Sequence, residues 1–485
     1  MIASILGNSS NKNFNAFQSI IGFFCDSKRT PEIIYEMLAH MGVSASLGGT
    51  RNMVKSLCKH TNTWLKTLPP CNMIYDNFDM DFKVAQPVAG HQGTHMSATA
   101  ATFAPYASAT PDDLRFTKEL HKTSIFNKDL HPDDPRIYKP TAFDLLPQRE
   151  PAGTSEDESM SSVDSDADPL NSLGKSFAWH MRSILVEREP RFEKYRHHCG
   201  APDVVDALPI QKTVQFPANA INADEGQNDG NWEVLKSLLD QVSDHSSTQY
   251  PVLTSTKTST ADRFLEDSLV LVHGDLATKE RIDTLCKMRT IEHTAKNRLD
   301  WVLFVPGMFH LKMACADATG FFEYIRHLRP RETGKFTSSP GFRRMHDAIH
   351  HTTWADILDC WRTEAQLLGF ASLDKFADSD PEWDVIERIS HKMIRTYLPG
   401  PNFQDIREGP DSERNIQFEN QVLRKQHSLM YLEFSHAMNH GDVGRILRLF
   451  PYWIAIFTAT GKHKYAAHMT KFKTDLNHVY PPRLR

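Results

Sequence analysis

The sequence predicts an α/β protein that is helical over most of its length, in which helices cover a mixed sheet. Two short apolar runs, Leu269–Val272 and Trp301–Val305, indicate strands, because each is rich in β-branched or bulky residues and has a glycine two residues after its end. Helical patterns with apolar residues near 3.6-residue spacing begin at Thr278, between the runs, and at His310, after them. This alternation of strand and helix is typical of a sheet covered by helices.

The overall composition limits the class of protein. A chain of 485 residues is too long for one ordinary core, so we expect two or three domains. A net charge of −5 gives no global case for nucleic-acid binding, so any such site has to be a local basic face. Seven scattered cysteines without a CxxC pair favour reduced thiols and an intracellular location. We expect no membrane as a partner, since no secretory signal is recognisable and no apolar run reaches about 18 residues.

The N-terminal residues 1–68 are expected to form a helical module. Thr30 and Pro31 are typical of a helix start, with Thr30 as the N-cap and Pro31 at the first position. A glycine-containing turn leads to a second helix, an arrangement that resembles a helix-turn-helix. The second helix carries Arg51, Lys55 and Lys59 at four-residue spacing, a basic stripe suited to DNA phosphates. The alternative is an ordinary helical hairpin with a solvated basic face.

The segment Met73–Val84 alternates between apolar and polar side chains, as expected for a strand with one buried face. Asp76 falls on the apolar face, where a carboxylate costs several kcal/mol unless it is paired, hydrogen-bonded or bound to a metal ion. Asp76 is therefore a candidate site residue. The alternative is that Asp76 and Asn77 form a turn outside the core. Ser97–Tyr106 is the expected next strand.

Further candidate acids follow later in the chain. Asp275 comes just after Leu269–Val272, and open α/β sheets place their chemistry just past the carboxyl ends of strands. Glu433 lies in the last turns of a long helical pattern, and Asp442 and Arg445 stand in the polar segment that follows it. That segment is either a capped turn or a carboxylate–guanidinium pair, in which Arg445 can position a phosphate.

Two or three carboxylates brought together by a sheet and a late helix can hold two divalent ions. Such ions stabilise the attacking and leaving oxygens of phosphodiester chemistry. Mg²⁺, or Mn²⁺ in its place, is the expected cofactor, because carboxylate oxygen is the hard ligand that Mg²⁺ prefers. Asp76 and Asp275 are the expected metal ligands, and the third acid stays open between Glu433 and Asp442.

The order of the expected elements is that of a ribonuclease-H-like core. In that order, a three-strand meander over Met73–Tyr106 holds the first acid, the helix Asn231–Val242 follows, and the two apolar runs supply the fourth and fifth strands. A large all-helical insertion then precedes the last acid. The expected domains are the N-terminal helical module (1–68), the first strands of the core (69–146), an acidic, serine-rich disordered linker (147–175), the remainder of the core (176–309), the helical insertion (310–432) and the closing helices (433–485).

Several segments resemble a protein family that is abundant in basidiomycete fungal genomes and catalogued as a domain of unknown function. The multi-copy character of that family resembles that of mobile elements. The segments cover most of the chain in order: TPEIIYEMLAHMGVSAS, IYDNFDMDFK, HMSATAATFAPY, GDLATKERI, PGMFHLKMA and GDVGRILRLFPYWIAIFTATGKHKYAAHM.

Asp275, followed by a strand and then by a Gly-Met-Phe-His segment that ends at His310, also resembles a pattern of eukaryotic cut-and-paste transposases. In those proteins the second catalytic Asp precedes a CxxH or DxxH motif, and a helical insertion separates it from a final Glu. The resemblance implies a DDE/D-type transposase in which Asp76, Asp275 and either Glu433 or Asp442 are catalytic and His310 positions phosphate. Gly307 stands where those proteins have Cys or Asp.

The expected function is metal-dependent cleavage and strand transfer on DNA by a nuclear protein. DNA and further copies of the chain are the expected partners. The alternative is a catalytically inactive, domesticated scaffold that binds DNA or other proteins, which the slight negative net charge favours.

Overall fold

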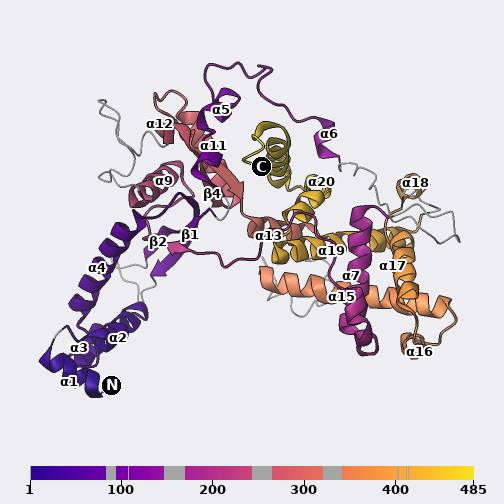
Figure 1. The fold of residues 1–485 in the computed structure, drawn as a ribbon, viewed down its shortest axis with the longest axis horizontal. Helices are drawn as coiled ribbons and strands as arrows, with labels where there is room; N and C mark the ends of the chain where they lie inside the picture. The colour runs from indigo at the N-terminus through magenta and orange to yellow at the C-terminus, as the bar shows by residue number, and fades with distance from the viewer. Residues whose placement is uncertain are drawn as a thin grey trace. The chain divides into compact units, whose positions relative to one another are not determined.

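The computed structural model describes residues 2–11, 13–82, 94–106, 109–146, 170–242, 265–320, 341–400, 403–410, 412 and 414–485. Over these residues the chain is mostly helical and contains a mixed sheet, as predicted (Figure 1). Two compact units are present, each assembled from separate stretches of chain: unit 1 comprises residues 1–134 and 213–305, and unit 2 comprises residues 135–212 and 306–483. The expected linker, 147–175, falls largely outside the described residues, and the expected domain boundaries stay predictions.

Unit 1 begins with four helices and continues with a sheet and the helices that cover it. Its elements are α1 (Ile2–Ser10), α2 (Ala16–Ser27), α3 (Glu32–His40), α4 (Leu47–Leu65), β1 (Cys71–Phe82), β2 (Thr94–Pro105), η1 (Pro111–Leu114), α5 (Thr117–Lys122), β3 (Phe216–Pro217), α9 (Asn228–Val242), β4 (Val270–Gly274), α11 (Leu276–Met288), α12 (Ala295–Arg298) and β5 (Val302–Pro306).

The sheet of unit 1 has five strands in the order β3-β2-β1-β4-β5. β1 pairs antiparallel with β2 from end to end, whereas it pairs parallel with β4, with Met73 opposite Val272. β2 pairs antiparallel with β3, with Phe103 opposite Phe216. In the described part of the expected meander, Met73–Tyr106, two strands are present, β1 and β2. The next strand of the sheet, β3, begins at Phe216, far along the chain from β2.

The face of β1 that is buried differs from the predicted one. Met73 and Tyr75 are 2% exposed and pack against apolar residues of α9 and α11, whereas Ile74 is 39% exposed and Asp76 is exposed. The prediction that Asp76 lies on the buried face was therefore wrong. Both faces of this strand carry apolar side chains, so the alternation alone does not identify the covered one. The covered face is the one that carries Met73, because the apolar faces of α9 and α11 pack on that side of the strand.

Tyr75 and its neighbours belong to the core of unit 1. This core joins β1, β2 and β4 to the two helices that cover them (Figure 1). Val234, Leu235 and Leu238 of α9 are fully buried in it, and Trp301, just before β5, closes it.

The N-terminal helices α2, α3 and α4 are held together by Tyr35, which is 1% exposed. Its hydroxyl donates to the carbonyl of Gly22 at 2.5 Å and contacts Oγ1 of Thr50 at 2.8 Å. Helix α3 starts one residue later than predicted, with Pro31 as its N-cap, because Pro31 has an extended ψ of 137°. The expected helix–turn–helix corresponds to α3 and α4.

Unit 2 is all-helical in the part of the chain that the structure describes. Its elements are α6 (Ala142–Leu145), α7 (Ser172–Arg188), η2 (Pro190–Tyr195), α8 (Arg196–Cys199), α13 (Met308–Ala318), α15 (Phe342–Leu367), α16 (Leu373–Asp378), α17 (Trp383–Tyr397), α18 (Phe403–Glu408), α19 (Ile416–His440), α20 (Val443–Ala459), α21 (His463–Thr474) and η4 (Asp475–Val479).

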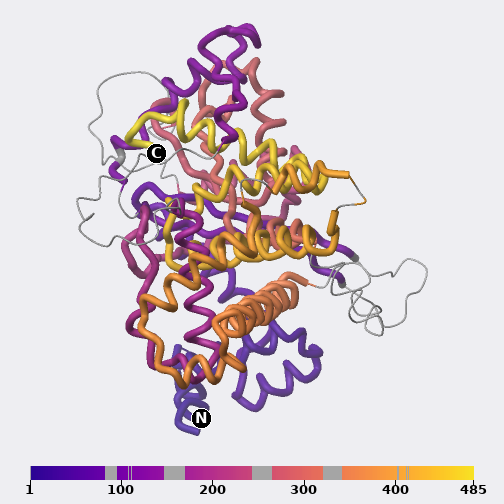
Figure 2. Tube along the Cα trace, turned by 90° about the vertical axis from the view of Figure 1, so that its right-hand side faces the viewer, coloured from indigo at the N-terminus to yellow at the C-terminus, as the bar shows by residue number. Residues whose placement is uncertain are grey.

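The core of unit 2 forms around α7, which packs against α15, α17 and α19 (Figure 2). Trp361 and Trp453 are fully buried in it, and the indole N–H of Trp361 donates to the carbonyl of Met181 at 3.1 Å. Among the helices that the structure describes, none combines the length and the apolar character needed to cross a bilayer.

Candidate functional site

Asp275 lies between β4 and α11, where the sequence predicted a site residue. It is the N-cap of α11: its Oδ1 accepts the backbone N–H of Thr278 at 2.7 Å and contacts the Thr278 hydroxyl at 2.9 Å. Gly274 permits this tight turn, because a Cβ at that position would lie 2.9 Å from the Thr278 side chain. Among the described residues Oδ2 of Asp275 has no hydrogen bond, so one oxygen of this carboxylate stays open to a ligand.

Asp76 is brought towards Asp275 by the parallel pairing of β1 and β4. This pairing sets Met73 opposite Val272 and Ile74 opposite His273. Continued by two residues, this register sets Asp76 opposite Asp275, on strands about 4.8 Å apart. Oδ1 of Asp76 accepts the backbone N–H of Asn77 at 2.9 Å.

Glu225 is a third carboxylate at this place, and sequence reasoning missed it. It lies in the loop between β3 and α9 and is 5% exposed. The backbone N–H of Asn77 acts on its carboxylate and lowers its pKa, and its Oε2 lies 3.3 Å from Oγ1 of Thr278. The same N–H and the same hydroxyl also contact Asp76 and Asp275, respectively. These shared contacts tie the three acids together.

The pKa of Glu225 reflects this crowding. Burial raises it first, and the negative charges of Asp275 and Asp76 raise it further, to about 7. Among the described residues neither Glu225 nor Asp275 has an ion pair with a Lys or Arg side chain. A buried carboxyl with raised pKa beside like charges is typical of functional sites.

The loop that carries Glu225 is fixed by α9 and α11. Nδ2 of Asn231 donates to the carbonyl of Glu225 at 3.2 Å, and Nε of Arg281 donates to the carbonyl of Gly226 at 2.7 Å. Gly230 lets the loop lie against the helix, because a Cβ there would come within 1.9 Å of the carbonyl oxygen of Asp224. An acidic pair followed by two glycines at the start of an amphipathic helix was the available sequence signal.

The donors of this cluster suit a hard divalent cation, since all three are carboxylates. In the described part of the chain, however, no three His, Cys, Asp or Glu side chains are near enough to one another to hold an ion as they stand. Metal binding would therefore need side-chain rotation, for which exposed Asp76 has room.

Glu433 and Arg445 form a buried ion pair inside unit 2. Nε and Nη2 of Arg445 donate to the two carboxylate oxygens of Glu433 at 2.7 and 3.0 Å, and Nε2 of His180 lies 2.8 Å from Oε2. The hydrogen bond and the charge of His180, with those of Arg445, hold the pKa of Glu433 at about 2 despite its burial. Nη1 and Nη2 of Arg445 also donate to the carbonyl of Asp203 and to Ser176. The pair thus joins α7, α19 and α20.

Asp442 is the N-cap of α20 and is 3% exposed. Its carboxylate accepts the backbone N–H groups of Val205, Asp206 and Arg445 at 3.0 to 3.1 Å. These bonds outweigh burial and lower its pKa. The capped turn and the carboxylate–guanidinium pair that the sequence left as alternatives are therefore both present. Catalytic roles for Glu433 and Asp442, and phosphate binding by Arg445, stay predictions.

His310 is the third residue of α13 and is half-buried, with its ring 5.9 Å from that of Phe309. Arg51, Lys55 and Lys59 are exposed along α4, as the predicted basic stripe requires. Among the described residues none of these three cations has an ion-pair partner, so their charge faces solvent.

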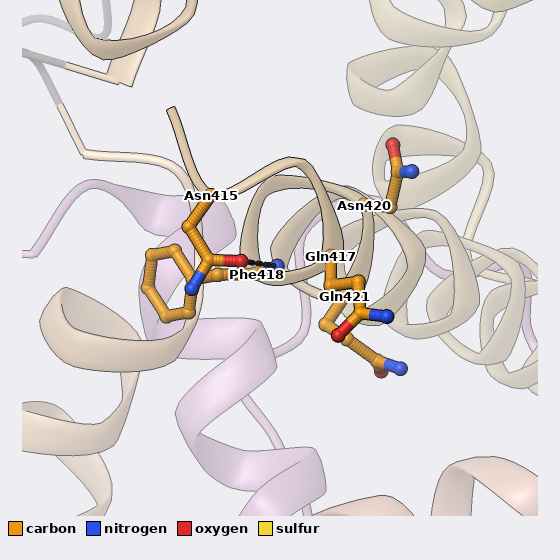
Figure 3. Close-up of a pocket in the computed structure, with 5 residues that line it drawn as sticks. All are labelled: Asn415, Gln417, Phe418, Asn420 and Gln421. Carbon is orange, nitrogen blue, oxygen red and sulfur yellow. Dashed lines mark hydrogen bonds between the residues drawn. The ribbon is translucent and has the colours of Figure 1, made fainter. Parts of the chain in front are cut away.

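A shallow hollow of about 510 Å³ lies at the start of α19 (Figure 3). Its lining is carboxamide-rich and exposed, and Oδ1 of Asn415 accepts the N–H of Phe418 at 3.0 Å. Among the described residues the lining contains no titratable group. The hollow is lined by Asn415, Gln417, Phe418, Asn420 and Gln421.

Comparison with known proteins assigns the chain to a protein family. Residues 153–485 match the model of a family described as "Family of unknown function (DUF6589)". The chain belongs to this family. No curated protein and no solved structure matches it.

The residues matched to the DUF6589 family include Glu225 and Asp275. They also include Glu433 and its two partners, Arg445 and His180. Asp76 and the basic stripe of α4 lie before the matched residues.

Proposed function

We propose that this chain is a divalent-metal-dependent enzyme that cleaves or joins DNA phosphodiesters, with Asp76, Glu225 and Asp275 as its metal-binding carboxylates. The observation that carries the proposal is the burial of Glu225 beside two other carboxylates, with no ion pair to Glu225 or Asp275 among the described residues. An excess of negative charge held in this way is stabilised by a bound cation.

The strand order supports a ribonuclease-H-like core of transposase origin. An antiparallel β1–β2 pair beside a parallel β1–β4 pair brings acids from the central strand and from the end of the fourth strand to the same place. Mg²⁺ or Mn²⁺ would supply stabilisation of the attacking and leaving oxygens. Asp275 is already oriented by its bonds to Thr278, and Glu225 exchanges its proton near neutral pH.

Mn²⁺ binding and DNA nicking test the proposal together. Wild-type protein is titrated with Mn²⁺ under electron paramagnetic resonance, and supercoiled plasmid is assayed for nicking with Mg²⁺ or Mn²⁺. We expect Asp76→Asn, Glu225→Gln and Asp275→Asn each to weaken Mn²⁺ binding and to abolish nicking. Asp81→Asn is the matched control, since Asp81 lies on the same strand but bonds to His95 at 2.8 Å. Unchanged Mn²⁺ binding in all three variants would overturn the proposal.

A DNA-binding scaffold without catalysis is the second candidate. It is favoured by the structural role of Asp275 as a helix cap and by the absence, among the described residues, of three acids close enough to hold an ion. In that case plasmid DNA still binds through α4, but Mn²⁺ does not bind and no metal supports nicking.

A further inference from the structure

Lys312, on α13 in unit 2, is a buried cation that forms no ion pair with any residue that the structure describes. The residue is 8% exposed, and burial lowers the pKa of its ammonium group. Among the described residues Nζ makes no hydrogen bond and no ion pair; its recorded contact is with the ring of Phe342, whose centroid is 6.0 Å away. An ammonium group in this situation costs free energy unless an anion joins it.

Two histidines of α15 lie near Lys312. The ring centroids of His346 and His350 are 4.3 Å apart, and the positive charge of Lys312 helps to lower the pKa of both histidines. Nδ1 of His346 is 2.9 Å from the hydroxyl of Tyr431, whereas Nε2 of His350 is buried and has no hydrogen-bond partner. Burial, followed by the neighbouring positive groups, lowers the pKa of His350 to about 3. The ring is thus neutral at pH 7 and can present an N–H at Nε2.

Among the described residues around this cluster, none forms an ion pair with Lys312 or His350. His180 and His351 add positive character, and the carboxylate that acts on His346 is that of exposed Asp347. Glu433, in the same unit, is already paired with Arg445 and His180. In the described part of unit 2, the ammonium group of Lys312 and Nε2 of His350 therefore have neither a hydrogen bond nor an ion pair.

We propose that Lys312, His346 and His350 form a binding site for a phosphate group, either inorganic phosphate or the phosphate of a nucleotide. A phosphate offers acceptors to both Nζ of Lys312 and Nε2 of His350 and offsets the buried positive charge. Lysine binds phosphate as a compact point charge, and the neutral ring of His350 can add an N–H donor. The site shares no residue with the carboxylate cluster. The phosphate-binding proposal therefore does not depend on whether that cluster is catalytic.

The test uses the full chain, titrated with inorganic phosphate and with adenosine monophosphate at constant ionic strength. Calorimetry gives the Kd, and thermal unfolding gives Tm. We expect phosphate to raise Tm by several degrees, and Lys312→Met and His350→Gln to weaken binding at least tenfold. Lys175→Gln is the control, since Lys175 is exposed on α7. Tighter binding of adenosine monophosphate identifies a nucleotide as the source, and tighter binding of inorganic phosphate identifies the free ion.

Tm without phosphate separates a binding role from a structural one. Lys312→Met removes an unpaired buried charge, so we expect the variant to unfold at a higher temperature than the wild type. A structural lysine would give the opposite shift. The proposal is overturned if neither probe binds the wild type, or if the variants bind as tightly as the wild type does. If Lys312→Met does not fold, the calorimetric Kd of His350→Gln alone tests the binding site.

Discussion

The hydroxyl of Tyr75, on the central strand β1, donates to Oδ1 of Asn231, on α9, at 3.0 Å, and both side chains are buried. The other end of the same carboxamide donates to the carbonyl of Glu225. One hydrogen-bonded chain therefore runs from the sheet through the helix to the acidic loop. The position of Glu225 depends on the packing of α9 against β1.

Removing the Tyr75 hydroxyl tests this chain. In Tyr75→Phe the buried Oδ1 of Asn231 loses its donor, and we expect the free energy of unfolding to fall by about 1–3 kcal/mol, measured by urea denaturation. Mn²⁺ binding should weaken as well, because the loop is less well held. Tyr138→Phe is the control: its hydroxyl donates to the carboxylate of Asp144, but Tyr138 is 38% exposed, so a smaller loss is expected. Equal losses of unfolding free energy in the two variants would contradict a special role for the hydrogen bonds from Tyr75 through Asn231 to Glu225.

The pKa of Glu225 predicts how stability depends on pH. The folded state holds this proton up to about pH 7, whereas the unfolded state releases it near 4.5, so the folded state binds more protons between these values. The contribution of Glu225 therefore lowers stability as pH rises from 4.5 to 7, by on the order of 3 kcal/mol in full. We expect Glu225→Gln to be more stable than the wild type at pH 8 and similar at pH 4.5.

Denaturation midpoints at several pH values measure this difference. At pH 8, Mg²⁺ should reduce the stability difference between Glu225→Gln and the wild type, because a cation stabilises the ionised wild type but not the variant. A difference that stays constant with pH would mean that Glu225 does not titrate in this range.

Two substitutions separate the cap of α11 from the charge of Asp275. Asparagine is as good an N-cap as aspartate, so Asp275→Asn should keep the stability of the wild type, whereas Asp275→Ala should lose about 0.5–2 kcal/mol. Both should lose Mn²⁺ binding, since both remove the carboxylate. Thermal unfolding and Mn²⁺ titration of the pair give the two readouts. If Asp275→Asn still binds Mn²⁺ normally, the carboxylate is only a cap.

Breaking the buried pair of Glu433 and Arg445 should strongly destabilise unit 2. Arg445→Leu leaves a buried carboxylate without its partner, and we expect a loss of about 3–5 kcal/mol in urea denaturation. Arg191→Leu is the control, since its ion pairs with Asp374 and Asp378 are half-exposed and worth about 0–1 kcal/mol. Because the pKa of Glu433 is lowered from 4.5 to about 2, its contribution is complete above pH 4.5 and is lost as pH falls towards 2.

The basic stripe of α4 predicts a salt dependence of DNA binding. Replacement of Arg51, Lys55 and Lys59 by alanine should weaken binding to any duplex sequence and reduce the slope of log K against log salt by about 3, roughly one for each lost phosphate contact. Fluorescence anisotropy at several salt concentrations measures the slope. Lys66→Ala, at the exposed end of the same helix, should change it far less. An unchanged slope in the triple variant would remove α4 from the DNA-binding surface.

The strands that the sequence predicted well are those with a strong local pattern. Val270–Gly274 and Val302–Pro306 are apolar runs stopped by glycine, and both were found within one or two residues of their observed bounds. Asp275 was found with them, because its place after a strand is a local feature. β3 has only two residues and pairs with β2 across a long separation, so no local pattern predicts it.

The acidic cluster was only half predictable for the same reason. Asp76 was chosen because it was expected on the buried face of β1, but the covered face is that of Met73 and Tyr75. Its nearness to Asp275 comes instead from the parallel pairing of β1 and β4, and its role as a site residue stays a prediction. Glu225 lies in a polar loop without periodicity. Its burial comes from the Asn231 bond and from the close approach that Gly230 allows, both of which are tertiary contacts.

The match to the DUF6589 family begins at residue 153, between β2 and β3. A protein fragment cut at that boundary would contain β3, β4 and β5 but not β1, which lies between β2 and β4 in the sheet. Asn231 and Val272 would lose the strand that covers them, and two unpaired edges would invite self-association. Residues 1–152 supplied as a separate polypeptide should therefore complement the fragment by inserting β1 as a donated strand.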